Sequence, residues 1–405
     1  FYGVAIGGLV FLNTWDGPIY WVVLVAAEGL RRVMSGDDYR LTWWDFAMTI
    51  GFGILVAIIA VIAYLPFLIG FRSQAGGIIP NLLHPTLFRQ YFIMFGPLLL
   101  LISGFLLVEI WRGTKQRALN WSLGFTVVGG IIGTILLLVL ALVIVFSVSP
   151  SIQHEVETVV AQQGGVSVVL PQLLGKRLSH ILTSLVLLGI LVVVVARLFP
   201  LAGKVKSDEP IEYPNATGFA LVLVAAAAGL TLIPEFVYLQ DVFGARINTV
   251  FKFYYQAWVL FSIASAYGVY TVLSDVHLPR PRVALRAIFG GILVFVLVAG
   301  LMYPVYAFYG RAVVEQNRHV QPVENWSSIT LDGRPDNLPA GYFDALMCLA
   351  DIVGNSDDVV IAEASRDTYN SPYGRAGAFL GLPTVINWEG HQRQWRGGTY
   401  PNVAG

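Results

Sequence analysis

Charged residues are scarce in this sequence. Only 12% of its 405 residues are Asp, Glu, Lys or Arg, and 56% are hydrophobic. Soluble domains carry about 25% charged residues, so a soluble protein of this size could not cover its surface with so few charges. The composition therefore excludes a soluble globular chain and predicts a polytopic protein of the cell membrane, with membrane lipids as its immediate partners.

Cysteine and unbalanced charge are lacking as well. Cys348 is the single cysteine, which excludes an internal disulfide and a cysteine-based zinc site. The 25 basic and 25 acidic residues cancel, so the net charge predicts no nucleic-acid partner. The histidines are scattered without ligand spacing, and no Walker loop, GxGxxG turn or nucleophile elbow occurs. The sequence thus indicates no metal site and no evident cofactor, although it leaves the need for a divalent metal open.

Long hydrophobic runs dominate what is present. A membrane helix needs about 20 mainly apolar residues. The complete runs of this length are 42–67, 91–111, 118–148, 178–200, 216–234, 249–275 and 284–309. A further stretch, 1–30, is interrupted by Asn13-Thr14-Trp15-Asp16-Gly17-Pro18 and is either one broken helix or the end of one span and the start of another. We predict an all-α transmembrane domain of about eight segments over residues 1–310. Because the chain begins inside an apolar run and ends in polar sequence, we interpret it as lacking both termini of a longer protein.

Lys and Arg predict the orientation, because cytoplasmic loops carry an excess of them. Alternate connections are rich in cations, which are Arg31, Arg32, Arg40, Arg112, Lys115, Arg117, Arg197, Lys204, Lys206, Arg280, Arg282 and Arg286. The connections between them hold half as many, which are Arg72, Arg89, Lys176, Arg177, Arg246 and Lys252. We therefore place the richer loops inside the cell. The longer opposite loops and the tail from Arg311 are then extracytoplasmic.

The tail, residues 311–405, differs from the rest in composition. Charge and turn residues return, and its apolar runs are short. An amphipathic helix is expected over 340–353, and buried strands are expected over 359–362 and 382–388. This order predicts the start of an incomplete α/β domain outside the membrane.

Asp16 is the first candidate for chemistry. A carboxylate flanked by apolar stretches is unfavourable near the bilayer, and an intramembrane ionisable group indicates a functional site. Asp16 is therefore a weak candidate for a catalytic residue. The alternative is a helix break at the outer interface, with Asp16 capping the next helix and Trp15 in the aromatic belt.

A second candidate lies at the start of the run 249–275. Two cations, amide side chains and a helix N-terminus at the outer membrane edge suit a phosphate or pyrophosphate. The residues expected to bind a lipid phosphate are Arg246, Asn248, Lys252, Tyr255 and Gln256. The alternative is that Arg246 meets lipid headgroups, that Lys252 snorkels outward, and that the aromatic residues form the interfacial belt.

A third candidate lies in the tail, beyond the ends of its two expected strands. Ligands of α/β sheets bind outside the carboxyl ends of the strands, and aromatic, amide and charged groups together suit a carbohydrate or an anion. The residues expected to bind a sugar or its acceptor are Glu363, Arg375, Trp388, His391, Trp395 and Arg396. An ordinary packing surface with polar loops is the equal alternative.

Two further patterns have structural interpretations. Glu28 and Glu109 lie near the inner ends of helices, so we expect them at the interface. Gly129 and Gly133 form a small-xxx-small pair, which predicts a close helix contact.

The motifs resemble one known group. The segments that carry the resemblance are Asn13-Thr14-Trp15-Asp16, 71–77, 246–258 and 381–396. They are similar to the YYY-type membrane protein family, found mainly in Chloroflexi and archaea, which distantly resembles the C-type membrane glycosyltransferases. The resemblance implies a polyprenyl-phosphate-linked sugar donor and an acidic catalytic residue on an outer loop. The name-giving Tyr-Tyr-Tyr motif and the acidic-His motif of the family would precede Phe1, so the catalytic base is not assigned.

The leading hypothesis is a glycosyltransferase-like protein acting on the outer membrane face. Its lipid-linked phosphate would meet Arg246 and Lys252, and tail residues such as Trp388 and His391 would meet the acceptor or the sugar. One alternative is a transporter or flippase for a lipid or polar solute, since broken helices and intramembrane polar groups occur there too. The other is a non-catalytic membrane scaffold subunit.

Overall fold

The structure is a computed structural model of the chain. It describes residues 1–35, 42–71, 77–81, 84–116, 118–148, 166–199, 215–240, 245–275, 280–315, 339–354, 358–364, 373–386 and 388–396. The chain divides into two compact units, Phe1–Tyr306 and Ala307–Gly405. This division lies close to the boundary expected at residue 310. Residues 151–163, whose sequence predicts a short amphipathic helix outside the membrane, lie outside the described residues.

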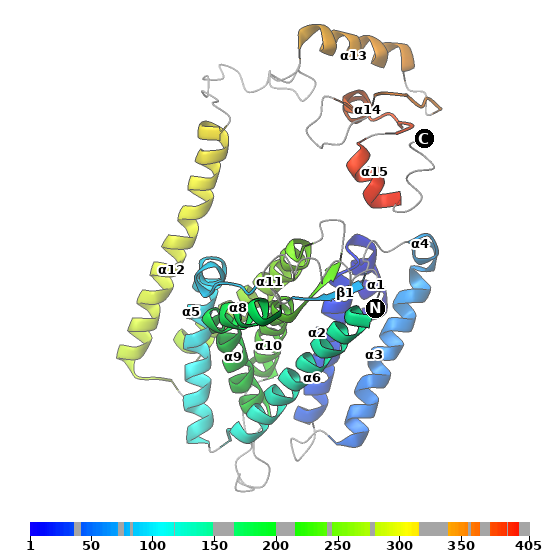
Figure 1. Cartoon of the computed structure of the whole chain (residues 1–405). Coiled ribbons are helices and arrows are strands. Elements are labelled where there is room, and N and C mark those ends of the chain that lie inside the picture. The colour runs from blue at the N-terminus through cyan, green and yellow to red at the C-terminus, as the bar shows by residue number, and fades with distance from the viewer. Residues whose placement is uncertain are drawn as a thin grey trace. The chain divides into compact units, whose positions relative to one another are not determined.

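The first unit is a bundle of helices with one short pair of strands (Figure 1). Its elements are α1 (Tyr2–Leu12), α2 (Asp16–Ser35), α3 (Trp43–Ala63), α4 (Leu65–Gly70), β1 (Gly77–Pro80), α5 (Phe88–Lys115), α6 (Trp121–Val148), α8 (Val166–Ser179), α9 (Leu182–Leu198), α10 (Asn215–Phe236), β2 (Val237–Gln240), α11 (Ile247–Leu273) and α12 (Val283–Tyr309). A π-helix, Gly310–Glu315, continues α12.

The predicted membrane spans are helices in the structure. Among the described residues, six helices are long and apolar enough to cross a membrane, which are α3, α5, α6, α10, α11 and α12. The pair α8 and α9 adds a seventh if it forms one span, and it is bent by 56° between Ser179 and Leu182. Each of the seven complete apolar runs in the sequence therefore corresponds to a helix, and the prediction of a polytopic helical protein is confirmed.

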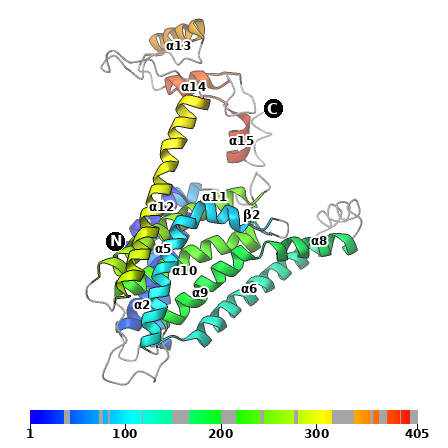
Figure 2. The same cartoon turned by 90° about the vertical axis from the view of Figure 1, so that its left-hand side faces the viewer.

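The helices of the first unit alternate in direction, which gives the bundle two distinct ends (Figures 1 and 2). We call one the basic end, where α2, α5, α9 and α11 finish. The described members of the richer cation set lie on these helix ends, just before α12 or in its first turn. We call the other the β end, because β1 and β2 lie there as an antiparallel pair, with Gly77 opposite Gln240 and Pro80 opposite Val237.

The interrupted stretch 1–30 forms two helices that run in opposite directions. The break falls at Asn13, whose extended backbone (φ −152°, ψ 109°) ends α1, and α2 starts at Asp16. Glycines allow α1 to lie close along the second half of α3, where a Cβ on Gly3 would stand 2.5 Å from Ile59. The helix α2 returns antiparallel to α3, with Gly29 beside Thr49 and Trp21 beside Gly53. The break therefore lies at the β end and separates the end of one apolar helix from the start of another.

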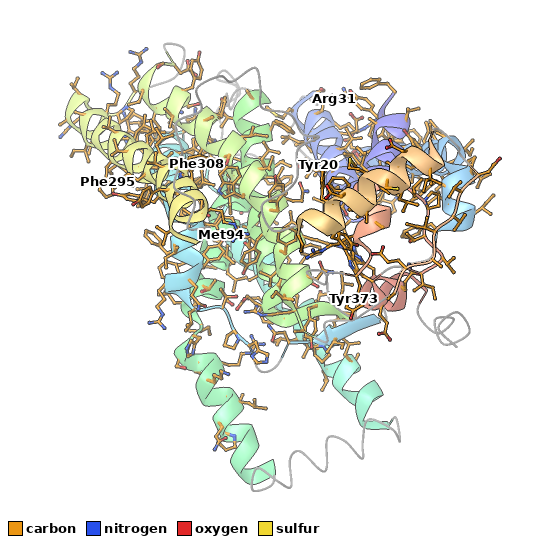
Figure 3. The ribbon with its side chains drawn as sticks, turned by 90° about the horizontal axis from the view of Figure 1, so that it is seen from above. Tyr20, Arg31, Met94, Phe295, Phe308 and Tyr373 are labelled. Carbon is orange, nitrogen blue, oxygen red and sulfur yellow. The ribbon has the colours of Figure 1, made fainter. Side chains whose placement is uncertain are left out.

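The core of the bundle surrounds α10. The span of α10 is 67% buried, whereas those of α6 and α12 are 6% and 11% buried. Large buried side chains from α5, α9, α10 and α11 fill the centre, among them Phe95, Phe105, Leu187, Leu221 and Phe261. On α12, Phe295 and Phe308 are exposed side chains (Figure 3). Apolar exposure of this extent is typical of a surface that faces lipid rather than water.

Glu109, near the end of α5, is buried among the helices, with Oε1 2.6 Å from Arg112 and Oε2 3.0 Å from Nε of Arg197. The expectation drawn from the glycine pair of α6 is wrong. The pair Gly129 and Gly133 makes no close helix contact, because space is open around both positions within the described residues. The close crossing of α6 lies instead at Gly124, where a Cβ would stand 2.6 Å from the backbone oxygen of Val192.

After the end of α12 and its π-helix, the described part of the second unit holds α13 (Ala340–Val353), α14 (Arg375–Leu380) and α15 (Glu389–Arg396). The helix expected over 340–353 is present as α13. Of the two expected strands, the described residues form a single parallel bridge, in which Ile361 donates to Pro383 (2.9 Å) and accepts from Val385 (3.1 Å). One bridge of this kind is not yet a sheet.

Candidate functional site

Asp16 is held in a polar network at the break between α1 and α2. Its Oδ1 accepts a hydrogen bond from Nδ2 of Asn13 (3.0 Å) and another from Nε2 of Gln256 (2.8 Å). The same Gln256 amide accepts a bond from the hydroxyl of Tyr20 (2.7 Å). Gln256 is buried and the other three residues are half-buried. The structure thus joins the first candidate segment to the second, across 240 positions of sequence.

Lys252 completes this network, which we call the break site (Asn13, Trp15, Asp16, Tyr20, Lys252 and Gln256). Its ammonium group lies 5.7 Å from the centre of the Trp15 ring, a cation–π geometry. Trp15 also packs edge-on against Phe253. Residues four apart share a helix face, so Lys252 and Gln256 both face the break from α11.

The remaining residues of the second candidate lie differently. Asn248 is half-buried one turn before Lys252, on the same face of α11. Tyr255 is 60% exposed and its ring lies 6.5 Å from that of Phe251. Tyr255 therefore lies on an exposed part of α11, whereas Gln256 is buried.

Arg246 faces a second cluster, which the sequence did not predict. Glu235, at the end of α10, is 1% exposed and accepts from Nη1 of Arg246 at 3.1 Å. The carboxylate also accepts from the backbone N–H of Thr86 (2.9 Å) and from the Thr86 hydroxyl. Nη2 of Arg246 donates to the same hydroxyl (3.0 Å), and the Tyr254 hydroxyl lies 3.3 Å from it. We call these four residues the Glu235 cluster.

Further polar groups fix the backbone around the Glu235 cluster. Arg177 donates to the backbone oxygen of Glu235 at 2.7 Å. Asn81, 2% exposed, donates to the backbone oxygens of Pro234 (2.8 Å) and His84 (3.0 Å). The hydroxyl of Thr183 donates to the backbone oxygen of Thr86 (2.8 Å). The loop before α5 is thereby tied to the ends of α8 and α10 and to the starts of α9 and α11.

The surroundings of the cluster are electrically positive. His84 lies outside the spanning helices, and its pKa is lowered, first by partial burial and then by the positive charges of Lys176, Arg246 and Arg177. Among the described residues, the carboxylate of Glu235 forms an ion pair with one of these cations, Arg246. The region thus combines three cations with one buried acid, an arrangement that favours an anion nearby.

The break site and the Glu235 cluster lie on opposite faces of the same helix turns. Tyr254 belongs to the cluster, whereas Lys252 and Gln256, two residues to either side, belong to the break site. A separation of two residues turns a side chain by about 200° around a helix. The start of α11 therefore contributes side chains to both polar sites.

In the second unit, Glu363 accepts backbone hydrogen bonds that begin α14, from the N–H groups of Arg375 (3.1 Å) and Ala376 (3.1 Å). The hydroxyl of Tyr342 donates to the Glu363 carboxylate at 3.3 Å. The pKa of Tyr342 is raised, first by partial burial and then by the charge of Glu363. Glu363 therefore has a structural role as a helix cap, whether or not it binds a ligand.

The other tail candidates lie near the start of α15. Nε1 of Trp388 donates to the backbone oxygen of Tyr373 (2.8 Å), and the rings of Trp388 and His391 lie 5.5 Å apart. Trp395 and Arg396 belong to the last turn of α15, and their side chains lie outside the described part. Within the described residues, no group of three or more His, Cys, Asp or Glu side chains is arranged to hold a metal ion.

The sequence around Glu235 contains a signal that marks it as a candidate functional residue. It follows Pro234 at the end of an apolar run, where a carboxylate is unfavourable without a partner. The apolar run in the sequence ends at residue 234, just before Glu235, whereas α10 continues to Phe236. Its partners Thr86 and Arg246 lie 149 and 11 positions away, and no local pattern links them.

The family comparison concerns the part of the chain that holds both polar sites. A family model described as "Uncharacterized membrane protein (DUF2298)" matches residues 1–261. No curated protein and no solved structure matches the chain.

Proposed function

The chain belongs to this DUF2298 family of membrane proteins. For such a membrane protein with polar groups gathered at one end of its bundle, we propose a glycosyltransferase-like function. In this proposal it transfers a sugar from a polyprenyl-phosphate donor on the outer membrane face. The orientation that we propose puts the basic end in the cytoplasm and the β end and the tail outside, in accord with the bias of Lys and Arg.

The observation that carries the proposal is the break site. It brings a carboxylate, an amide, a phenol and an ammonium group together at the end of a membrane bundle. Sugar transfer breaks the bond between the anomeric carbon and the phosphate oxygen and joins that carbon to an acceptor hydroxyl. Negative charge grows on the departing phosphate, and a nearby cation stabilises it.

We assign these roles to named side chains. Lys252 contacts the phosphate, with Asn248 one turn nearer the start of α11. Asp16 is the candidate base for the acceptor's proton, and its hydrogen bonds from Asn13 and Gln256 fix its orientation. Arg246 already donates to Glu235 and Thr86, so its main role is to position the start of α11.

The tail is proposed as the start of an α/β domain that binds the sugar or the acceptor. The parallel bridge between Ile361 and Thr384 supports the first part. The neighbouring Trp388 and His391 rings, which offer an aromatic face, support the second.

Replacement of Lys252 tests the enzymatic proposal. The chain is reconstituted in liposomes with labelled polyprenyl-phosphate hexoses and oligosaccharide acceptors, and transfer of the label is measured. We expect Lys252→Met to abolish transfer, because the ammonium group at the phosphate is lost. Lys115→Met is the matched control, since Lys115 also lies over an indole ring, that of Trp111 at 4.3 Å, but at the basic end. Equal transfer by the Lys252→Met protein and the wild type, or no transfer from any donor by the wild type, contradicts the proposal.

A transporter or flippase is the second candidate. The 56° bend between α8 and α9 and the break between α1 and α2 favour it, because discontinuous helices form the binding sites of many transporters. The same liposomes distinguish the two candidates. Movement of the labelled lipid or solute across the bilayer, with the sugar still attached to its donor, indicates transport.

A further inference from the structure

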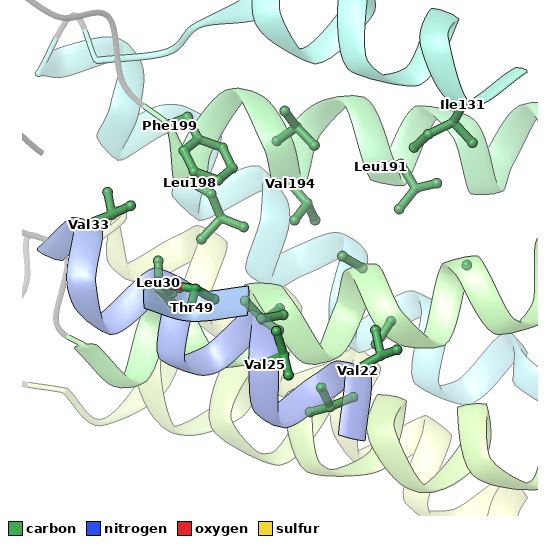
Figure 4. Close-up of a pocket in the computed structure, with 18 of the residues that line it drawn as sticks. Val22, Val25, Leu30, Val33, Thr49, Ile131, Leu191, Val194, Leu198 and Phe199 are labelled. Carbon is green, nitrogen blue, oxygen red and sulfur yellow. The ribbon is translucent and has the colours of Figure 1, made fainter. Parts of the chain in front are cut away.

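A partly open apolar cavity of about 720 Å³ lies between helices of the first unit (Figure 4). It is bounded by α2, α3, α6, α9 and α10. On α2 the lining extends from Trp21 to Val33, and twelve helical steps make this roughly 18 Å. The cavity is therefore elongated along the bundle. Its dimensions suit an extended hydrocarbon chain rather than a compact solute.

Thr49 is the exceptional residue of its wall. Of the residues that line the cavity, Trp21 and Thr49 carry polar side-chain atoms. The indole N–H of Trp21 donates to the backbone oxygen of Gly53 (2.9 Å). Thr49 is 7% exposed, and its hydroxyl has no hydrogen-bond partner among the described residues.

In the described helices, other threonines of the bundle form a hydrogen bond to the helix backbone that Thr49 lacks. The hydroxyls of Thr114 and Thr134 donate to the backbone oxygen four residues earlier, at 2.7 and 2.9 Å. A buried hydroxyl without such a bond is unfavourable in an apolar wall. The hydroxyl of Thr49 is thus available to a group inside the cavity.

The depth of Thr49 and the nearby charges indicate the kind of ligand. Thr49 lies six residues from the start of α3, roughly 9 Å along the helix, and the interfacial layer of a bilayer is about 5–7 Å thick on each side. Trp43 and Trp44 begin α3 and are strongly exposed, as interfacial tryptophans are. At the same end, α2 carries Arg31 and Arg32 against one acid, Glu28.

We propose that the cavity holds one acyl chain of an anionic phospholipid from the leaflet at the basic end. The chain runs along the valine- and leucine-rich walls, and its ester carbonyl accepts a hydrogen bond from Thr49. The phosphate faces Arg31 and Arg32. Their two positive charges outnumber the single negative charge of Glu28, so a net positive charge remains for the phosphate. This inference is independent of the proposed sugar transfer, because Thr49, Arg31 and Arg32 belong to neither the break site nor the Glu235 cluster.

Lipid counting on the whole chain tests the proposal. The protein is reconstituted in equal parts phosphatidylglycerol and phosphatidylcholine, extracted in mild detergent, and weighed with its retained lipids by native mass spectrometry. Gly229→Leu fills the cavity, since Gly229 lines it and a Cβ there meets open space. Gly51→Leu is the matched control, because Gly51 on α3 also has open space but does not line the cavity.

We expect the wild type and Gly51→Leu to retain one phosphatidylglycerol and Gly229→Leu to retain none. Thr49→Val keeps the shape and removes the hydroxyl, and the loss of one hydrogen bond lowers occupancy about fivefold. Thr134→Val, outside the cavity, leaves occupancy unchanged. Wild-type occupancy in both Gly229→Leu and Thr49→Val overturns the chain site, and equal retention of phosphatidylcholine overturns the assignment of an anionic headgroup. If Gly229→Leu does not fold, the isosteric Thr49→Val decides by itself.

Discussion

Glu235 connects several elements at the β end. It is buried, and its carboxylate joins α10 to Thr86 and to Arg246 at the start of α11. Glu235→Gln keeps the shape but removes the charge that balances the guanidinium group. Breaking a buried ion pair costs about 3 kcal/mol, so we expect a clear fall in the melting temperature, measured in detergent micelles.

The control for Glu235→Gln is Arg31→Gln, because Arg31 is 61% exposed and pairs with Glu28 at the other end of the bundle. An exposed pair contributes about 0–1 kcal/mol, so its melting temperature should stay near that of the wild type. Equal melting temperatures for Glu235→Gln and Arg31→Gln would show that the Glu235 cluster does not stabilise the fold.

His84 gives the β end a dependence on pH. Partial burial and the positive charges of Lys176, Arg246 and Arg177 lower its pKa from the ordinary 6.5. Below pH 6.5 the unfolded chain binds a proton that the folded chain does not yet bind, so the unfolding free energy falls as the pH falls. Between pH 7.5 and 5.5 we expect the melting temperature of the wild type to fall further than that of His84→Gln. An identical fall in both proteins would contradict the lowered pKa of His84.

At the scale of elements, the crossing of α6 and α9 depends on Gly124. A Cβ at this position would stand 2.6 Å from the backbone oxygen of Val192, which cannot move aside as a side chain can. We expect Gly124→Ala to lower the melting temperature. Gly129→Ala on the same helix should leave it unchanged or raise it, because space is open there and alanine gains up to about 1 kcal/mol of helix propensity. The reverse order of the two variants would contradict this crossing.

The same helix shows how far sequence patterns reach. Apolar runs and Lys and Arg loops predicted the helices and their alternation, because length and hydropathy suffice for a span. They did not predict the packed face of α6, which is apolar all round and has glycines on more than one side. The small-xxx-small pattern at Gly129 and Gly133 therefore indicated the wrong contact, while Gly124 outside it makes the close one.

The candidate site has a similar limit. Asp16 and the start of α11 each appeared as separate signals, because polar groups beside apolar runs are unusual. Their union through Gln256 is a tertiary contact with no local pattern. Arg246 was paired with Lys252 in the sequence because both are cations near one helix start. The structure directs Arg246 to Glu235 and Lys252 to Trp15.

At the scale of the whole molecule, the two ends of the bundle differ in the chemistry they offer. The basic end carries Arg31, Arg32, Lys115 and the buried Glu109 group. The β end carries the break site and the Glu235 cluster. If cations select the cytoplasmic side, lipid recognition belongs to the inside and sugar chemistry to the outside. The proposed function thus depends on an orientation that is itself testable.

The single cysteine of the sequence provides that test. Cys348 lies exposed on α13 in the second unit, so a membrane-impermeant maleimide added to intact cells should label it. In a Cys348→Ser background, Lys115→Cys places the thiol on an exposed residue at the basic end, and we expect labelling there after permeabilisation alone. The reverse result, with Lys115→Cys labelled in intact cells and Cys348 protected, would invert the topology. It would also move the break site to the cytoplasmic side, where an extracytoplasmic sugar acceptor could not reach it.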